Sequence, residues 1–76
     1  MKIDKAINIK GEVCPYTFVK SKLAIEGLKS GQVLEIILDH APACENVPRS
    51  MTNEGNEVVE VKKINNSDWR IVIKKK

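Results

Sequence analysis

Residues 11–17, Gly-Glu-Val-Cys-Pro-Tyr-Thr, mark the point where a predicted strand gives way to a predicted helix. Proline is favoured at the first position of a helix, because its missing N–H would be unpaired there. Cys14 is therefore predicted to cap the helix, facing the free N–H groups of the first turn. The helix dipole favours the nucleophilic thiolate there. We expect Cys14 to be a reactive thiol. The alternative is that Cys14 is a small buried hydrophobic residue at the end of a strand.

The rest of the chain divides into alternating elements around this stretch. Apolar residues that alternate with polar ones predict strands, and apolar residues at helical spacing predict helices. Turn residues at 65–68 indicate that the last two strands form an antiparallel hairpin. The expected elements are a strand over 3–9, a helix over 15–29, a strand over 33–38, a helix over about 43–54, and strands around 58–61 and 69–73.

Pro48 complicates the second predicted helix. Proline has no N–H and clashes with the preceding turn when it lies inside a helix. Either it is tolerated as a kink, or the regular helix begins near it with Asn46 as the cap. The sequence leaves both alternatives open.

The order of the elements predicts an α+β fold: a two-layer βαβαββ sandwich with a four-stranded mixed sheet and both helices on one face. Seventy-six residues make a single domain, 1–76. Each helix begins where the preceding strand ends, so both helix starts lie at one edge of the sheet, the usual place for a site. Cys14, Asp39, His40 and Cys44 are predicted to gather at that edge.

Composition narrows the class of protein. Two cysteines in so short a chain do not make a secreted disulfide scaffold. No signal peptide and no run long enough to span a membrane is apparent, so we expect a cytoplasmic protein without membrane insertion. The three lysines at 74–76 account for the whole net charge of +3. Those lysines either contact nucleic acid, anionic lipid or an acidic partner, or form a solvated end that protects an edge strand.

Three further side chains are secondary candidates for chemistry. Cys44 is a resolving thiol, a second sulfur site or a disulfide partner of Cys14, or else inert packing, which we favour because no cap pattern frames it. His40 either tunes the thiolate or donates a proton, or has no role. Asp39 precedes it at the strand end. The spacing of Cys14, His40 and Cys44 matches no compact ligand pair, so no metal is expected.

Val19 and Leu23 lie four residues apart on the first predicted helix, away from its main apolar stripe. They either form an exposed patch for a partner protein or tuck under the border of the sheet. The sequence favours neither alternative.

The motif Gly-x-x-Cys-Pro at 11–15, between a strand and a helix, resembles the TusA/SirA family of sulfur carriers. The resemblance covers nearly the whole chain, including the segment 38–40, Pro48 and the strand with Trp69. The short length and the last strand are particularly similar to the YeeD branch, which is associated with thiosulfate uptake. The family fold, a two-layer βαβαββ sandwich, agrees with the order of elements.

The resemblance implies a sulfurtransferase-type carrier that accepts a sulfane sulfur as a persulfide on Cys14, next to Pro15. It implies no metal and no organic cofactor. The expected partners are a donor (a cysteine desulfurase, a rhodanese or a thiosulfate transporter) and an acceptor protein, in thiosulfate utilisation or a thiolation relay. We expect a monomer. Thr17 stands where the family has a second proline, and its hydroxyl can donate to the sulfur or stiffen the first turn.

The alternative function is a small nucleic-acid-binding or regulatory module without thiol chemistry. The lysines at 74–76 are consistent with it. The chain has only three aromatic residues, however, and none lies in a basic cluster that would stack bases. We therefore do not expect nucleic acid as a partner.

Overall fold

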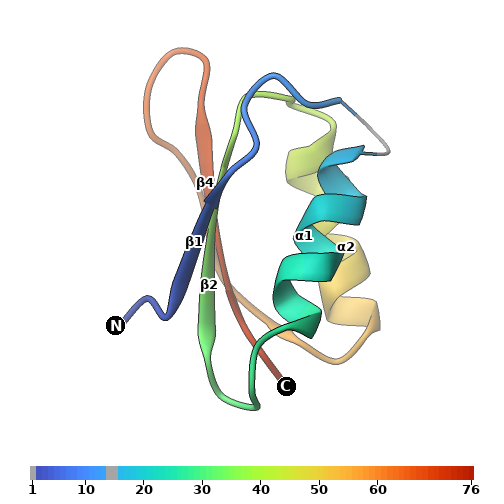
Figure 1. The fold of residues 1–76 in the computed structure, drawn as a ribbon. Helices are drawn as coiled ribbons and strands as arrows, with labels where there is room; N and C mark the ends of the chain where they lie inside the picture. The colour runs from blue at the N-terminus through green and yellow to red at the C-terminus, as the bar shows by residue number, and fades with distance from the viewer. Residues whose placement is uncertain (1, 14–15) are drawn as a thin grey trace.

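The computed structural model describes residues 2–13 and 16–76, which form four strands and two helices (Figure 1). The order along the chain is the predicted one, β-α-β-α-β-β. The elements are β1 (Lys5–Asn8), α1 (Tyr16–Glu26), β2 (Val33–Leu38), α2 (Ala43–Asn53), β3 (Glu57–Lys63) and β4 (Trp69–Lys74).

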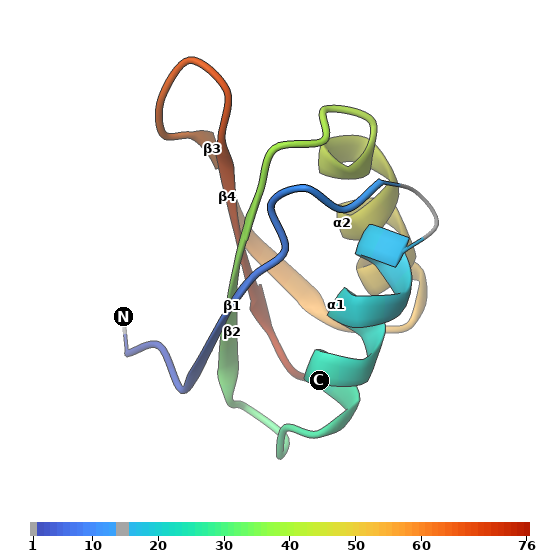
Figure 2. The same ribbon diagram turned by 45° about the horizontal axis from the view of Figure 1, so that its top comes forward.

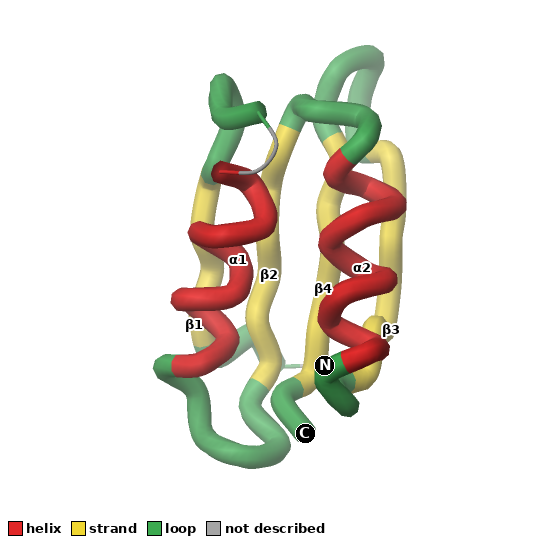
Figure 3. Tube along the Cα trace, turned by 90° about the vertical axis from the view of Figure 1, so that its right-hand side faces the viewer, coloured by secondary structure: helices red, strands yellow, loops and turns green. Residues whose placement is uncertain are grey.

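The four strands form one mixed sheet in the order β1-β2-β4-β3. β1 pairs with β2 in parallel, while β4 runs antiparallel to both β2 and β3. Both helices lie side by side over one face of the sheet, and the other face is bare (Figures 1 and 3). The predicted two-layer α+β sandwich and the predicted hairpin are therefore confirmed.

The hydrophobic core fills the space between the helices and the sheet. Alternate residues of β2 point toward the helices, as the two-residue period of a strand requires. α2 contributes residues at intervals of four, which place them on one helical face. The completely buried core residues of these elements and of β4 are Leu34, Ile36, Leu38, Ala43, Val47, Met51, Ile71 and Ile73.

Two predicted boundaries were too generous. The first strand is four residues long rather than the predicted 3–9, although Ile9 remains buried and its N–H bonds to Ile37. The first helix ends at Glu26 rather than at residue 29, because Gly27, a poor helix former, follows it. Leu28 therefore packs against the core from the loop and not from the helix.

The lysines at the end of the chain are not the solvated cover of an edge strand. Lys74 belongs to β4, which lies between β2 and β3. The N–H of Lys75 donates to the carbonyl of Gln32 at 2.7 Å, and its own carbonyl accepts from Gly31 at 2.9 Å. The backbone of this segment is thus part of the fold.

Arg70 ties three strands together on the bare face of the sheet. Its Nε lies 2.6 Å from Oε2 of Glu35 on β2, and its Nη1 lies 2.7 Å from Oε1 of Glu60 on β3. Both carboxylates raise the pKa of the guanidinium further, mainly through the hydrogen bond with Glu35.

The structure excludes the alternative in which the second helix begins near Pro48 with Asn46 as its cap. α2 is one helix from Ala43 to Asn53, and Pro48 lies within it. A second proline, Pro42, stands at the N-cap with φ −58°, where proline is well tolerated. Pro48 therefore lies at a position where proline destabilises a helix, whereas Pro42 lies at one where proline is tolerated.

Replacing Pro48 by alanine should stabilise the protein. Alanine restores an N–H that can donate to the carbonyl four residues earlier, so we expect Pro48→Ala to raise the free energy of unfolding by about 1–3 kcal/mol. Urea unfolding followed by circular dichroism measures this difference. Pro42→Ala is the matched control and should change stability by no more than about 0.5 kcal/mol. A Pro48→Ala variant no more stable than the wild type would contradict the strain assigned to this position.

Candidate functional site

The starts of both helices lie at one end of the sheet, as the order of elements predicts (Figure 2). Asp39 and His40 follow β2 at this end, and Cys44 lies in the first turn of α2. The loop that follows β1 reaches the same end, because the N–H of Gly11 donates to Oδ1 of Asp39 at 2.9 Å. Asp39, His40 and Cys44 therefore lie at this end of the sheet. That Cys14 gathers with them stays a prediction, because Cys14 and its neighbour Pro15 lie outside the described residues.

Backbone hydrogen bonds fasten the chain on either side of residues 14 and 15. The N–H of Ile9 donates to Ile37 on β2 at 2.8 Å. On the helical side, the carbonyl of Val13 accepts from the N–H of Tyr16 at 2.8 Å and from that of Thr17 at 3.3 Å. The chain that leads to the cysteine is thus joined both to the sheet and to the first turn of α1.

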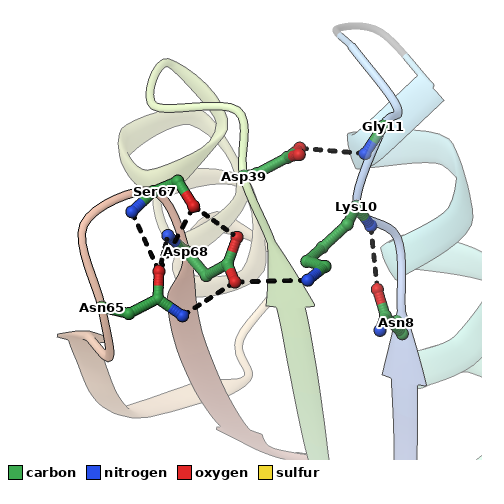
Figure 4. A network of polar contacts seen from close by, with 7 residues as sticks. All are labelled: Asn8, Lys10, Gly11, Asp39, Asn65, Ser67 and Asp68. Atoms are coloured by element: carbon green, nitrogen blue, oxygen red, sulfur yellow. Dashed lines mark hydrogen bonds and ion pairs between the residues drawn. The ribbon is translucent and has the colours of Figure 1, made fainter.

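A polar network joins the loop after β1 to the tip of the β3–β4 hairpin (Figure 4). Nζ of Lys10 lies 3.3 Å from Oδ2 of Asp68, which also accepts from Nδ2 of Asn65 at 2.9 Å. The Ser67 hydroxyl donates to Oδ1 of Asp68 at 3.3 Å. These hydrogen bonds hold the pKa of Asp68 below its usual range. The bond from Asn65 has the largest effect, followed by those from Lys10 and Ser67.

Asp68 should make stability depend on pH in the acid range. A carboxyl whose pKa is lowered by folding stabilises the native state above its unfolded pKa of about 3.9. That contribution is lost as the pH falls through the lower, folded pKa. We expect the wild type to be more stable than Asp68→Asn at pH 7, with the difference shrinking below about pH 4. Urea unfolding at a series of pH values tests this, and a difference that is independent of pH would contradict it.

Thr17, the residue in place of the family's second proline, is completely buried. Its carbonyl accepts a hydrogen bond of 2.7 Å from the hydroxyl of Ser21, one turn later on α1. Ser21 is also completely buried, and its small side chain lets this face of the helix lie close to the core. The bond from Ser21 uses the backbone of Thr17, so both predictions for the Thr17 hydroxyl, a bond to Cys14 and the stiffening of the first turn, remain predictions.

Cys44 is half-buried and packs against the hydrophobic core. Its sulfur lies 4.0 Å from the carbonyl oxygen of His40, to which a thiol is a weak donor. Burial raises the pKa of the Cys44 thiol above its usual value. A thiol with a raised pKa is a poor nucleophile at neutral pH, so these properties support inert packing among the predicted alternatives.

The low reactivity of Cys44 can be measured in Cys14→Ser, where it is the one remaining thiol. At pH 7 we expect iodoacetamide to modify folded Cys44 several-fold more slowly than the same chain unfolded in urea, because burial suppresses the thiolate. A Cys44→Ser variant serves as the control for Cys14. Equal rates in the folded and unfolded chains would show that the environment of Cys44 does not protect it.

The two alternatives for Val19 and Leu23 are decided in favour of exposure. Val19 is 44% exposed and Leu23 is 65% exposed on α1. Tyr16, 60% exposed, precedes them at the spacing that places all three along one side of the helix. α1 therefore carries an exposed apolar stripe that begins two residues after Cys14.

Residues 2–13 and 16–76 carry neither a metal-binding cluster nor a membrane-spanning helix. No group of three or more His, Cys, Asp or Glu side chains there is arranged to hold a metal ion. Within the same residues, neither helix has the length and apolar character needed to cross a lipid bilayer.

Comparison with known proteins identifies the family. The profile of the sulfurtransferase TusA family matches residues 5–75. A candidate sulfur carrier protein of Archaeoglobus fulgidus is 47% identical over 76 residues, which cover 100% of this chain and 86% of that protein. Another, from Thermotoga maritima, is 35% identical over 75 residues, covering 99% and 95%. The chain belongs to the TusA family of sulfurtransferases.

A solved structure supports the fold independently. The crystal structure of a SirA-like protein from Desulfitobacterium hafniense superposes with a TM-score of 0.81, over 92% of this chain and 95% of that one. Sequence identity between the two is 22%, so the likeness concerns the fold.

Sequence reasoning did not foresee the bond between Lys10 and Asp68. The two residues are 58 positions apart, and Lys10 lies in no motif. The turn at 65–68 was predicted, but nothing in its composition indicates that its last residue contacts the loop after β1. The bond from Gly11 to Asp39 was also not foreseen, although Asp39 was predicted to lie at this edge.

Proposed function

We propose that this protein carries sulfur as a persulfide on Cys14, taking it from a donor and handing it to an acceptor protein. The family match over residues 5–75 carries this proposal, because it includes the Cys14-Pro15 stretch. The low reactivity assigned to Cys44 supports the choice of Cys14 as the working thiol. We place the protein in the cytoplasm as a monomer, working without a cofactor.

The chemistry is an exchange between thiols in which one sulfur atom moves. The Cys14 thiolate attacks the outer sulfur of a donor persulfide, the donor's S–S bond breaks, and the donor leaves as a thiolate. With thiosulfate as donor, the same attack on the sulfane sulfur releases sulfite. An acceptor thiolate then attacks the terminal sulfur on Cys14, and the Cys14 thiolate leaves. Each step forms one S–S bond and breaks one sulfur–sulfur bond, so no external oxidant is needed.

In such a relay the thiol of a partner protein must come close to Cys14. Two described features of the protein would allow a partner to approach. Both helices begin at one end of the sheet, so this edge lies at the periphery of the fold (Figures 1 and 2). The exposed stripe of Tyr16, Val19 and Leu23 adjoins it and offers apolar surface to a docking protein. Thiosulfate utilisation and a thiolation relay are both compatible with this arrangement.

Intact mass spectrometry tests the proposal. After incubation with thiosulfate, or with a cysteine desulfurase and cysteine, the wild type should gain the mass of one sulfur atom, which dithiothreitol removes. Cys14→Ser should gain nothing, and the matched variant Cys44→Ser should gain as much as the wild type. If Cys14→Ser takes up sulfur as the wild type does, the assignment of the site is wrong.

A further inference from the structure

Besides the ion pairs of Lys10 with Asp68 and of Glu12 with Lys20 on α1, the described part of the loop after β1 makes one backbone N–H bond to a side chain of another element. Within the described part of this loop, the N–H of Glu12 donates back to Ile9 at 3.1 Å, and the N–H of Lys10 donates to Oδ1 of Asn8 at 3.0 Å. The N–H of Gly11, by contrast, crosses to Oδ1 of Asp39 at 2.9 Å (Figure 4). Asp39 thereby ties the loop to the end of β2, the central parallel partner of β1.

Gly11 adopts a backbone conformation that makes this bond important. Its φ is +90°, in the region that residues with a side chain rarely adopt. A Cβ atom at Gly11 would meet no other atom within 4 Å, so the backbone angle and not lack of space calls for glycine. Glycine is also the most flexible residue, and an acceptor that holds its N–H therefore removes much of the loop's freedom.

We propose that Asp39 is a positioning residue for Cys14: by accepting the Gly11 N–H, it fixes the loop three residues before the thiol. This inference rests on the proposed function of Cys14 as the reacting thiol. Val13, the residue before Cys14, accepts hydrogen bonds from the N–H groups of Tyr16 and Thr17, which follow the cysteine. Gly11 is thus held to the end of β2, and Val13 is held to the first turn of α1.

The Lys10–Asp68 contact is a weaker constraint on the same loop. It runs through a long lysine side chain that is 45% exposed, so it restricts the backbone less than a bond to an N–H does. Asp39 is exposed as well, and water screens its charge. The hydrogen-bond acceptor of Asp39, and not its charge, is therefore what holds the Gly11 N–H. Asparagine keeps a side-chain oxygen that can accept this bond, so Asp39→Asn should preserve the function of the residue.

Asp4 provides a matched control at the other end of the sheet. Its Oδ2 accepts from the N–H of Val33 at 2.8 Å, the same kind of bond at nearly the same length. Val33 begins β2, whereas Asp39 follows its last residue. Loss of the Asp4 bond should affect the fold much as loss of the Asp39 bond does, without reaching the loop that leads to Cys14.

The experiment compares Asp39→Ala, Asp39→Asn and Asp4→Ala in a Cys44→Ala background, where Cys14 is the one thiol. Two rates are measured at pH 7: alkylation by iodoacetamide, and sulfur uptake from thiosulfate by intact mass. We expect Asp39→Ala to lower both by about 3- to 10-fold, the factor that corresponds to one net hydrogen bond. Asp39→Asn and Asp4→Ala should both stay within about twofold of the parent, since neither removes the acceptor from Gly11.

The role of Asp39 is overturned if Asp39→Ala reacts like the parent, or if Asp39→Asn or Asp4→Ala is as slow as Asp39→Ala. Circular dichroism of each variant checks folding, and Asp39→Ser replaces Asp39→Ala should the latter not fold. The two rates also separate this inference from the proposed function. A parent that takes up no sulfur from thiosulfate or from a desulfurase counts against the proposed function, while the order of alkylation rates still decides the role of Asp39.

Discussion

The structure depends above all on the burial of β2, which lies between β1 and β4 and faces the layer of helices. Leu34, Ile36 and Leu38 are completely buried, so any slip of this strand would expose apolar surface. β2 also pairs with β1 in parallel and with β4 in antiparallel orientation, and it is the strand through which the two halves of the chain meet. The position of its last residue is thereby fixed, and with it the edge of the sheet where both helices begin.

At that edge, a series of contacts runs from the hydrophobic core to the loop that precedes Cys14. The core fixes β2, the residue after β2 accepts a bond from Gly11, and Gly11 belongs to the loop that leads to Cys14. Cys44, in contrast, packs against the hydrophobic core, and burial raises the pKa of its thiol. Burial thereby suppresses the thiolate of Cys44, which supports the proposal that sulfur transfer belongs to Cys14.

The sequence predicted the fold well because each element carries its own signal. The apolar run at 33–38 and the turn residues at 65–68 fixed β2 and the hairpin with little ambiguity. The end of α1 was misplaced because Leu28 continues the apolar spacing although Gly27 has already ended the helix. Contacts such as that between Lys10 and Asp68 could not be predicted from the sequence, because they depend on how close two loops lie in the fold and not on any local pattern. The placement of Cys14 by its motif remains a prediction.

The double pairing of Arg70 has a consequence for how the strands find their alignment. Arg70 contacts Glu35 and Glu60 on the two strands beside it, on the face opposite the helices. A slip of one position would turn its guanidinium toward the apolar layer and separate it from both carboxylates. The ion pairs of this half-buried trio therefore favour the native register over a sheet shifted by one position.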